Sequence, residues 1–99
     1  MNFSEALVHL REGKFLRRRG WNGKGMCIFL TEGSVVAMKN LKPRSKEAIC
    51  LRAEGCEYTD ETVVYVRDHI DMVAADGTLV IGWLASQTDM LSEDWEIVE

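Results

Sequence analysis

The chain has 99 residues, a formal net charge of −4 and a hydrophobic share of 46%. This composition is typical of a single globular domain and excludes a disordered chain, and the acidic balance argues against DNA as a partner. No apolar run reaches the roughly 18 residues of a membrane span, and the N-terminus lacks a secretion-signal pattern, so the sequence predicts a cytoplasmic protein without a membrane partner.

The first third predicts a helix followed by two strands. Residues 2–12 have an apolar face at helical spacing, and Asn2 and Glu5 at their start are spaced as a capping box. Residues 14–19 predict a short strand, and residues 26–31 predict a more apolar, central one. The connection between them, GWNGKG, is rich in turn-forming residues.

The middle third is less regular. Residues 32–43 are compatible with either a strand or a short helix. Residues 43–54 predict a helix, with a proline near its start and Gly55 just past its end. Residues 62–66 are rich in β-branched side chains and predict a strand or the edge of a loop.

The last third predicts a hairpin, a short helix and a closing strand. The hairpin spans residues 69–83 and turns at an Asp-Gly pair. Ser86 and Asp89 have the spacing of a second capping box, and residues 95–98 predict a strand. We therefore expect a single α+β domain over residues 1–99. It combines a small antiparallel sheet with an N-terminal helix, a middle helix and a short C-terminal helix before the last strand.

Positive charge collects in the first half of the chain. Residues 1–52 hold 11 of the 12 lysines and arginines, whereas residues 53–99 hold 12 of the 16 acidic residues. The densest basic stretch is RRRGWNGKGM, residues 17–26, in which cations surround Trp21. It is either a solvated turn with a packing tryptophan or a pocket. In the pocket, the ring offers a stacking face and Arg18 and its neighbours hold phosphates.

Patterns for catalysis or metal binding are weak. His69 and Asp71 share a strand face and are able to pair, but nothing marks a serine as their partner. The glycines of GWNGKG match neither GxxxxGK(S/T) nor GxGxxG, the two common spacings of phosphate-binding loops. The three cysteines contain no CxxC pair and fit a reducing compartment. The sequence thus predicts no enzymatic activity, no metal and no cofactor.

The first turn of the predicted C-terminal helix is a second candidate for ligand binding. Gln87, Thr88 and Asp89 occupy this turn, and helix N-termini present free N–H groups to anions. A simple capping box explains Ser86 and Asp89, but it does not use Gln87.

Four blocks of the sequence stand out: MNFSEALVHLREGK, RRRGWNGKGM, HIDMVAADGT and GWLASQTDMLSEDWEIV. In this order they resemble the second class of Thoeris anti-defence proteins, which are small phage or prophage proteins. They lie within residues 1–30 and 69–99, roughly two-thirds of the chain, and residues 33–67 show no counterpart.

The resemblance implies a sponge that binds a cyclic nucleotide-like immune signal, glycocyclic ADP-ribose, and withholds it from its effector without cleaving it. Some members of the family also take up cyclic dinucleotides in separate pockets. The resemblance further implies a homotetramer with ligand pockets at subunit interfaces, which acts in the cytoplasm of the bacterial host and inhibits anti-phage defence.

The expected ligand-binding residues come from the first helix, the arginine-rich turn and the start of the last helix. The first helix would supply the apolar side of a base pocket, and the other two segments the polar and stacking contacts. These residues are Phe3, Leu7, Arg18, Trp21, Asn22, Gln87, Thr88 and Asp89.

The alternative prediction is a function of another class that would use the same surface. Arginines beside an exposed tryptophan also suit a module that binds single-stranded nucleic acid or another protein. The acidic second half of the chain argues against this alternative.

Overall fold

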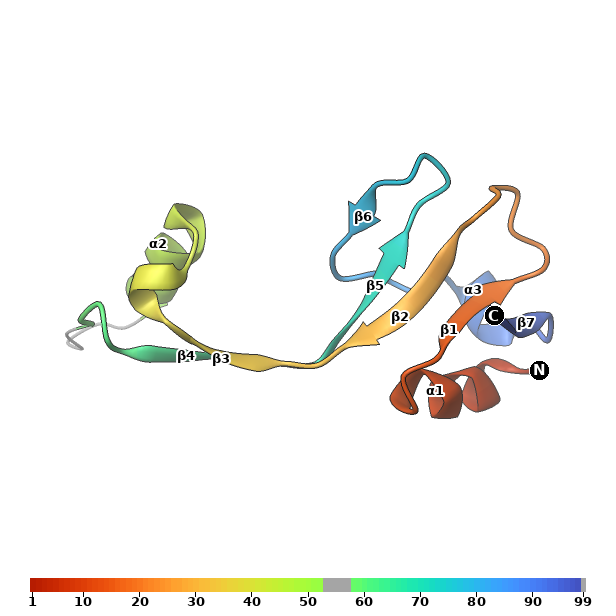
Figure 1. Cartoon of the computed structure of the whole chain (residues 1–99), viewed down its shortest axis with the longest axis horizontal. Coiled ribbons are helices and arrows are strands. Elements are labelled where there is room, and N and C mark those ends of the chain that lie inside the picture. The colour runs from red at the N-terminus through yellow and green to blue at the C-terminus, as the bar shows by residue number, and fades with distance from the viewer. Residues whose placement is uncertain (53–57, 99) are drawn as a thin grey trace. The chain divides into compact units, whose positions relative to one another are not determined.

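The computed structural model describes residues 1–52 and 58–98, and its elements are labelled in Figure 1. The chain divides into two compact units: Met1–Glu32 with Asp68–Glu99 form unit 1, and Gly33–Arg67 form unit 2. The elements in chain order are α1 (Phe3–Arg11), β1 (Phe15–Arg18), β2 (Cys27–Thr31), β3 (Ser34–Ala37), η1 (Met38–Asn40), α2 (Pro43–Arg52), β4 (Val63–Val66), β5 (His69–Val73), β6 (Leu79–Val80), α3 (Gln87–Leu91) and β7 (Trp95–Val98).

Unit 1 is built on a five-stranded antiparallel sheet with the strand order β6-β5-β2-β1-β7. β2 is central and pairs along its whole length with β5. β1 lies between β2 and β7, with Arg18 of β1 opposite Trp95 of β7. This pairing places the end of the arginine run beside the acidic segment that precedes β7.

The core of unit 1 lies where α1 packs against the sheet. Ala6 and Leu10 of α1 are fully buried, together with Leu16 of β1 and Ile28 of β2. Burial of each Leu or Ile side chain stabilises a fold by about 2 kcal/mol. Trp95 completes this core at 2% exposure, as its alternating apolar neighbours predict.

Local signals set the ends of α1 as the sequence predicts. The N–H of Glu5 donates to Asn2 Oδ1 at 2.9 Å, and the N–H of Asn2 donates to Glu5 Oε1 at 3.0 Å. This reciprocal pair is the expected capping box. Gly13 follows the helix with a φ of +87°, a conformation that side chains with a Cβ rarely adopt.

Unit 2 is a two-stranded antiparallel sheet, β3 and β4, accompanied by η1 and α2. The strands pair from Ser34 opposite Val66 to Ala37 opposite Val63. Met38 is buried, but none of the α2 residues is. A two-stranded sheet has little core of its own, so apolar side chains of unit 2 such as that of Tyr65 remain exposed.

The predicted α+β class and antiparallel pairing are confirmed. Residues 32–43, compatible with a strand or a short helix, contain both, because β3 runs directly into η1. The helix predicted over residues 43–54 is observed as far as Arg52, and its predicted end at residue 54, with Gly55 just past it, lies outside the described residues. The single functional domain stays a prediction. No helix in the described ranges has the length and apolar character of a membrane span.

Candidate functional site

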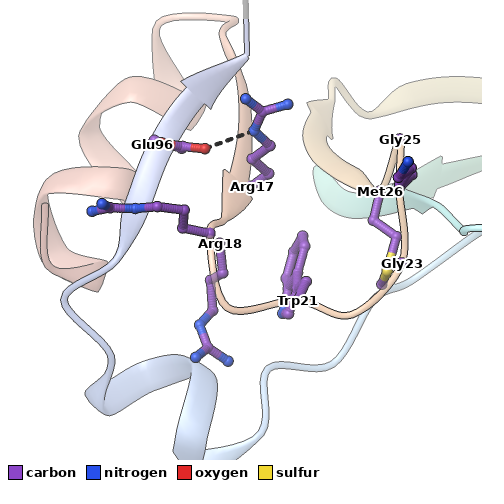
Figure 2. A pocket seen from close by; sticks show the side chains of 9 residues that line it. Arg17, Arg18, Trp21, Gly23, Gly25, Met26 and Glu96 are labelled. Atoms are coloured by element: carbon purple, nitrogen blue, oxygen red, sulfur yellow. Dashed lines mark hydrogen bonds and ion pairs between the residues drawn. The ribbon is translucent and has the colours of Figure 1, made fainter.

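A hollow of about 280 Å³ lies where β1 runs into the turn toward β2. Figure 2 shows the Trp21 ring standing between the end of β1 and this turn. The stretch RRRGWNGKGM forms the hollow almost by itself. The lining residues are Arg17, Arg18, Arg19, Trp21, Gly23, Lys24, Gly25, Met26 and Glu96.

Two glycines allow the turn to follow this path. Gly25 has a φ of +76°, in the left-handed region. A Cβ at Gly23 would approach the Cβ of Ala75 to 2.5 Å and the Sδ of Met26 to 2.6 Å, closer than such atoms can pack. The turn therefore lies tightly against the loop that connects β5 and β6.

The guanidinium of Arg18 is held between two carboxylates. Its Nη1 donates to Asp89 Oδ1 and its Nε donates to Asp94 Oδ1, both at 2.9 Å. The second oxygen of Asp94 accepts the N–H of Gly20 at 2.7 Å. The Arg18 side chain is only 13% exposed, and its hydrogen bond to Asp94 lowers the pKa of that carboxyl group. The charge of Arg18 is thus compensated within the protein.

Asp89 connects the start of α3 to the arginine-rich turn. Its Oδ2 accepts the N–H of Ser86 at 3.1 Å, and Ser86 Oγ accepts the N–H of Asp89 at 3.0 Å, which confirms the predicted capping box. Its Oδ1 also accepts the Nε1–H of Trp21 at 3.1 Å. Burial raises the pKa of Asp89, but hydrogen bonds from Arg18, Trp21 and Ser86 outweigh this effect and lower it overall.

The three tryptophans form an aromatic cluster behind the hollow. The Trp21 ring lies edge-on to Trp95, with ring centroids 5.3 Å apart, and edge-on to Trp83 at 6.3 Å. Phe3 of α1 joins the cluster, 5.4 Å from Trp95. Trp21 is half-buried. It therefore satisfies both sequence interpretations, because it packs on the core and also lines the hollow.

The cations that line the hollow differ in whether their side chains are paired. Arg17 forms an exposed ion pair with Glu96 at 2.8 Å. Arg19 and Lys24 are exposed, and neither side chain has an ion-pair or hydrogen-bond partner within residues 1–52 and 58–98. The predicted binding residues include Arg18 by name but neither Arg19 nor Lys24. The available signal was the stretch RRRGWNGKGM itself, because its cations, Arg18 included, line the hollow.

The structure brings three of the predicted binding residues together. Arg18, Trp21 and Asp89 share one hydrogen-bonded network, which we call the Asp89 network. Asn22 is exposed in the turn next to Trp21.

The other predicted binding residues lie elsewhere in unit 1. Gln87 and Thr88 are exposed on the first turn of α3 and do not line the hollow. Phe3 packs within the aromatic cluster, while Leu7 lines a different hollow of about 340 Å³ beside Trp83. Their roles as ligand contacts stay predictions.

The predicted pairing of His69 with Asp71 is observed, and it belongs to a set of contacts that hold the sheet together. Asp71 is 2% exposed and accepts hydrogen bonds from Thr31 Oγ1 at 2.6 Å and from the N–H of Gly82 at 2.9 Å. His69 Nε2 lies 3.3 Å from the same carboxylate. These contacts tie β2 and β5 to the segment after β6. No group of metal-ligating side chains occurs in the part of the chain that the structure describes.

Arg18→Met should destabilise the protein, because it leaves Asp89 and Asp94 without their shared cation. We expect the midpoint of thermal unfolding to fall by about 5 °C or more. Arg17→Met is the matched control, since it removes an exposed pair from the adjacent position, and its midpoint should fall by less than about 2 °C. Equal shifts in the two variants would show that Arg18 has no special structural role.

Acid should unfold unit 1 through its paired carboxylates. The pKa values of Asp71, Asp89 and Asp94 are all lowered in the fold. The stability that they contribute is therefore complete above the unfolded carboxyl pKa of about 3.9 and is lost as the pH falls through the lower folded values. Melting curves should shift little between pH 7 and about pH 5 and fall steeply below about pH 4. A midpoint that stays constant down to pH 2.5, or rises, would contradict this.

Comparison with known sequences identifies a family that matches nearly the whole chain. A family model described as a Thoeris anti-defense 2-like domain matches residues 1–98. The chain is 34% identical over 98 residues to "Thoeris anti-defense 2" of Bacillus phage SP01, an alignment that spans 99% of this chain and 94% of that protein. Both matches include residues 33–67, where the sequence blocks had no counterpart. The chain belongs to the Thoeris anti-defense 2-like family.

Proposed function

We propose that this protein binds and sequesters glycocyclic ADP-ribose, or a related cyclic nucleotide, in the host cytoplasm without cleaving it. Family membership implies inhibition of Thoeris defence, and sequestration of the signal is the means we propose. The observation that carries this proposal is the hollow beside Trp21, where an aromatic ring lies next to two exposed cations, Arg19 and Lys24, with no partner in the described chain.

The hollow suits the two chemical parts of such a ligand. A base or ribose packs on the Trp21 ring, and a pyrophosphate lies between Arg19 and Lys24. Charge-assisted hydrogen bonds to these cations contribute about 1.5–3 kcal/mol each. Arg18 also lines the hollow, but its Nε and Nη1 already donate to Asp94 and Asp89.

Polar residues of the turn and of the start of α3 supply the specific contacts in this proposal. The side-chain amides of Asn22 and Gln87 and the hydroxyl of Thr88 are exposed, and they offer neutral donors and acceptors to ribose hydroxyls and base edges. Phe3 and Leu7 shape the apolar surroundings. Some family members take up cyclic dinucleotides in separate pockets, and the hollow lined by Leu7 and Trp83 is the place we assign to such a ligand.

The state of Asp89, the most enclosed carboxylate beside the hollow, supports binding without turnover. Its lowered pKa keeps it ionised at neutral pH, so it is a poor general acid. Its oxygens already accept three hydrogen bonds, from Arg18, Trp21 and Ser86, which makes it a weak general base.

We also propose that the protein is a homotetramer whose interfaces enclose the ligand. A 99-residue chain with a basic first half and an acidic second half has complementary surfaces for self-association. Light scattering at micromolar concentration should give the mass of four chains. A monomer under these conditions would contradict both the tetramer and an interface pocket.

Titration calorimetry against three ligands tests the function. Glycocyclic ADP-ribose should bind in the nanomolar range, about −12 kcal/mol. A single-stranded RNA oligonucleotide should bind weakly or not at all at physiological salt. Tight, salt-dependent RNA binding without binding of the cyclic nucleotide would favour the alternative of a nucleic-acid module. A cyclic dinucleotide, titrated into protein already saturated with the first ligand, tests the second hollow.

A further inference from the structure

Asp89 contacts two residues that line the hollow, Arg18 and Trp21, but does not line it itself. Its side chain is 12% exposed, and its Oδ1 faces the guanidinium of Arg18 and the indole N–H of Trp21. Asp89 is also absent from the residues that line the hollow. A carboxylate with this surrounding has little surface to offer a ligand.

The Trp21 ring is fixed from two directions. Trp83 and Trp95 pack against the ring in T-shaped contacts, and the hydrogen bond to Asp89 fixes the direction in which the indole nitrogen points. Figure 2 shows the ring between the end of β1 and the following turn. Without its acceptor, the half-buried indole N–H would turn toward water, and the ring face would leave the hollow.

We propose that Asp89 is a positioning residue for the ligand site: it orients the Trp21 ring and does not touch the ligand. This inference rests on the proposed function for its effect on binding, and on the structure alone for its effect on Trp21. It changes the role of Asp89, which is one of the ligand-binding residues predicted from the sequence.

The first test observes the indole protons directly by NMR in the full chain without ligand. The Trp21 signal is identified by its absence in Trp21→Phe. In Asp89→Ala, exchange of the Trp21 indole proton with water should accelerate about tenfold or more, because its acceptor is lost. The Trp95 indole is the internal control. It donates at 2.9 Å to the backbone carbonyl of residue 89, which the substitution retains, so its exchange should change little.

The second test is a double-mutant cycle on the affinity for glycocyclic ADP-ribose. Asp89→Ala should weaken binding about tenfold or more in the wild-type background. Trp21→Phe keeps an aromatic face but has no indole N–H, so in this background Asp89→Ala should weaken binding by less than about threefold. Glu93→Gln, which removes one exposed negative charge from the adjacent loop, should leave the affinity unchanged.

The outcomes distinguish a failure of the positioning role of Asp89 from a failure of the proposed ligand binding. Unchanged exchange of the Trp21 indole in Asp89→Ala overturns the positioning role, and so does an equal loss of affinity in both backgrounds, because that result means that Asp89 acts on binding independently of the Trp21 indole. If the wild-type protein fails to bind glycocyclic ADP-ribose, the proposed function is wrong, and the indole exchange still decides whether Asp89 orients Trp21. If Asp89→Ala does not fold, Asp89→Asn replaces it, since the amide keeps an acceptor but loses the charge, and intermediate effects are expected.

Discussion

Replacement of Arg19 and Lys24 by glutamate should abolish capture of the signal while the fold stays intact. These side chains have no ion-pair or hydrogen-bond partner in the described chain, so their loss breaks no side-chain contact of this kind. Two charge-assisted contacts to a pyrophosphate are lost and two repulsive charges are added. We expect a loss of affinity of about 100-fold or more, with a melting temperature within about 2 °C of wild type.

The matched control for this charge reversal is Lys42→Glu with Arg52→Glu. Both residues are exposed in unit 2, and the pair changes the net charge by the same amount. Its affinity should stay within about threefold of wild type at physiological salt. If the control loses as much affinity as the Arg19 and Lys24 variant, the ligand responds to net charge alone and the hollow is not its site.

Trp21→Ala should also abolish capture, with an additional and moderate cost in stability. The variant removes the stacking face and one of the hydrogen-bond donors to Asp89, so we expect affinity to fall by about 100-fold or more. Trp21 packs on the core cluster but is only half-buried, so the free energy of unfolding should fall by about 2 kcal/mol, less than for a fully buried aromatic residue. Binding is measured by calorimetry, and stability by denaturant titration.

Ile97→Ala separates the two effects of that substitution. Ile97 packs against the same core from β7, but it does not line the hollow. Its truncation should lower stability by a similar amount and leave the affinity near wild type. Unfolding of Trp21→Ala at room temperature would show that Trp21 is mainly a packing residue, as the other sequence interpretation holds.

Local signals made most of the fold predictable. Both capping boxes, at Asn2 and at Ser86, depend on contacts between residues three apart, and the hairpin turn depends on one Asp-Gly pair. Period-two and helical patterns identified β1, β2, β7 and α1 because each buries one face in a common core. Unit 2 was harder to predict, since the described part of α2 buries no side chain and so carries only a weak apolar stripe.

The site was only partly predictable because its contacts join distant parts of the chain. Arg18 meets Asp89 and Asp94 across 71 and 76 positions, and only the pairing of β1 with β7 brings them together. The sequence showed the clustering of arginines around Trp21, but it did not show which arginine the acidic residues would occupy. For the same reason it could not identify Arg19 and Lys24 as the cations left for a ligand.

Recovery of the bound ligand tests the central claim, sequestration without cleavage, most directly. The protein is incubated with glycocyclic ADP-ribose for hours, freed of unbound ligand by filtration and then heated, and the released molecule is identified by mass spectrometry and by its ability to activate the effector. We predict that the intact cyclic species is recovered in proportion to the protein and that it activates the effector fully. A linear or hydrolysed product that increases with time would contradict the account, because the protein would then be an enzyme.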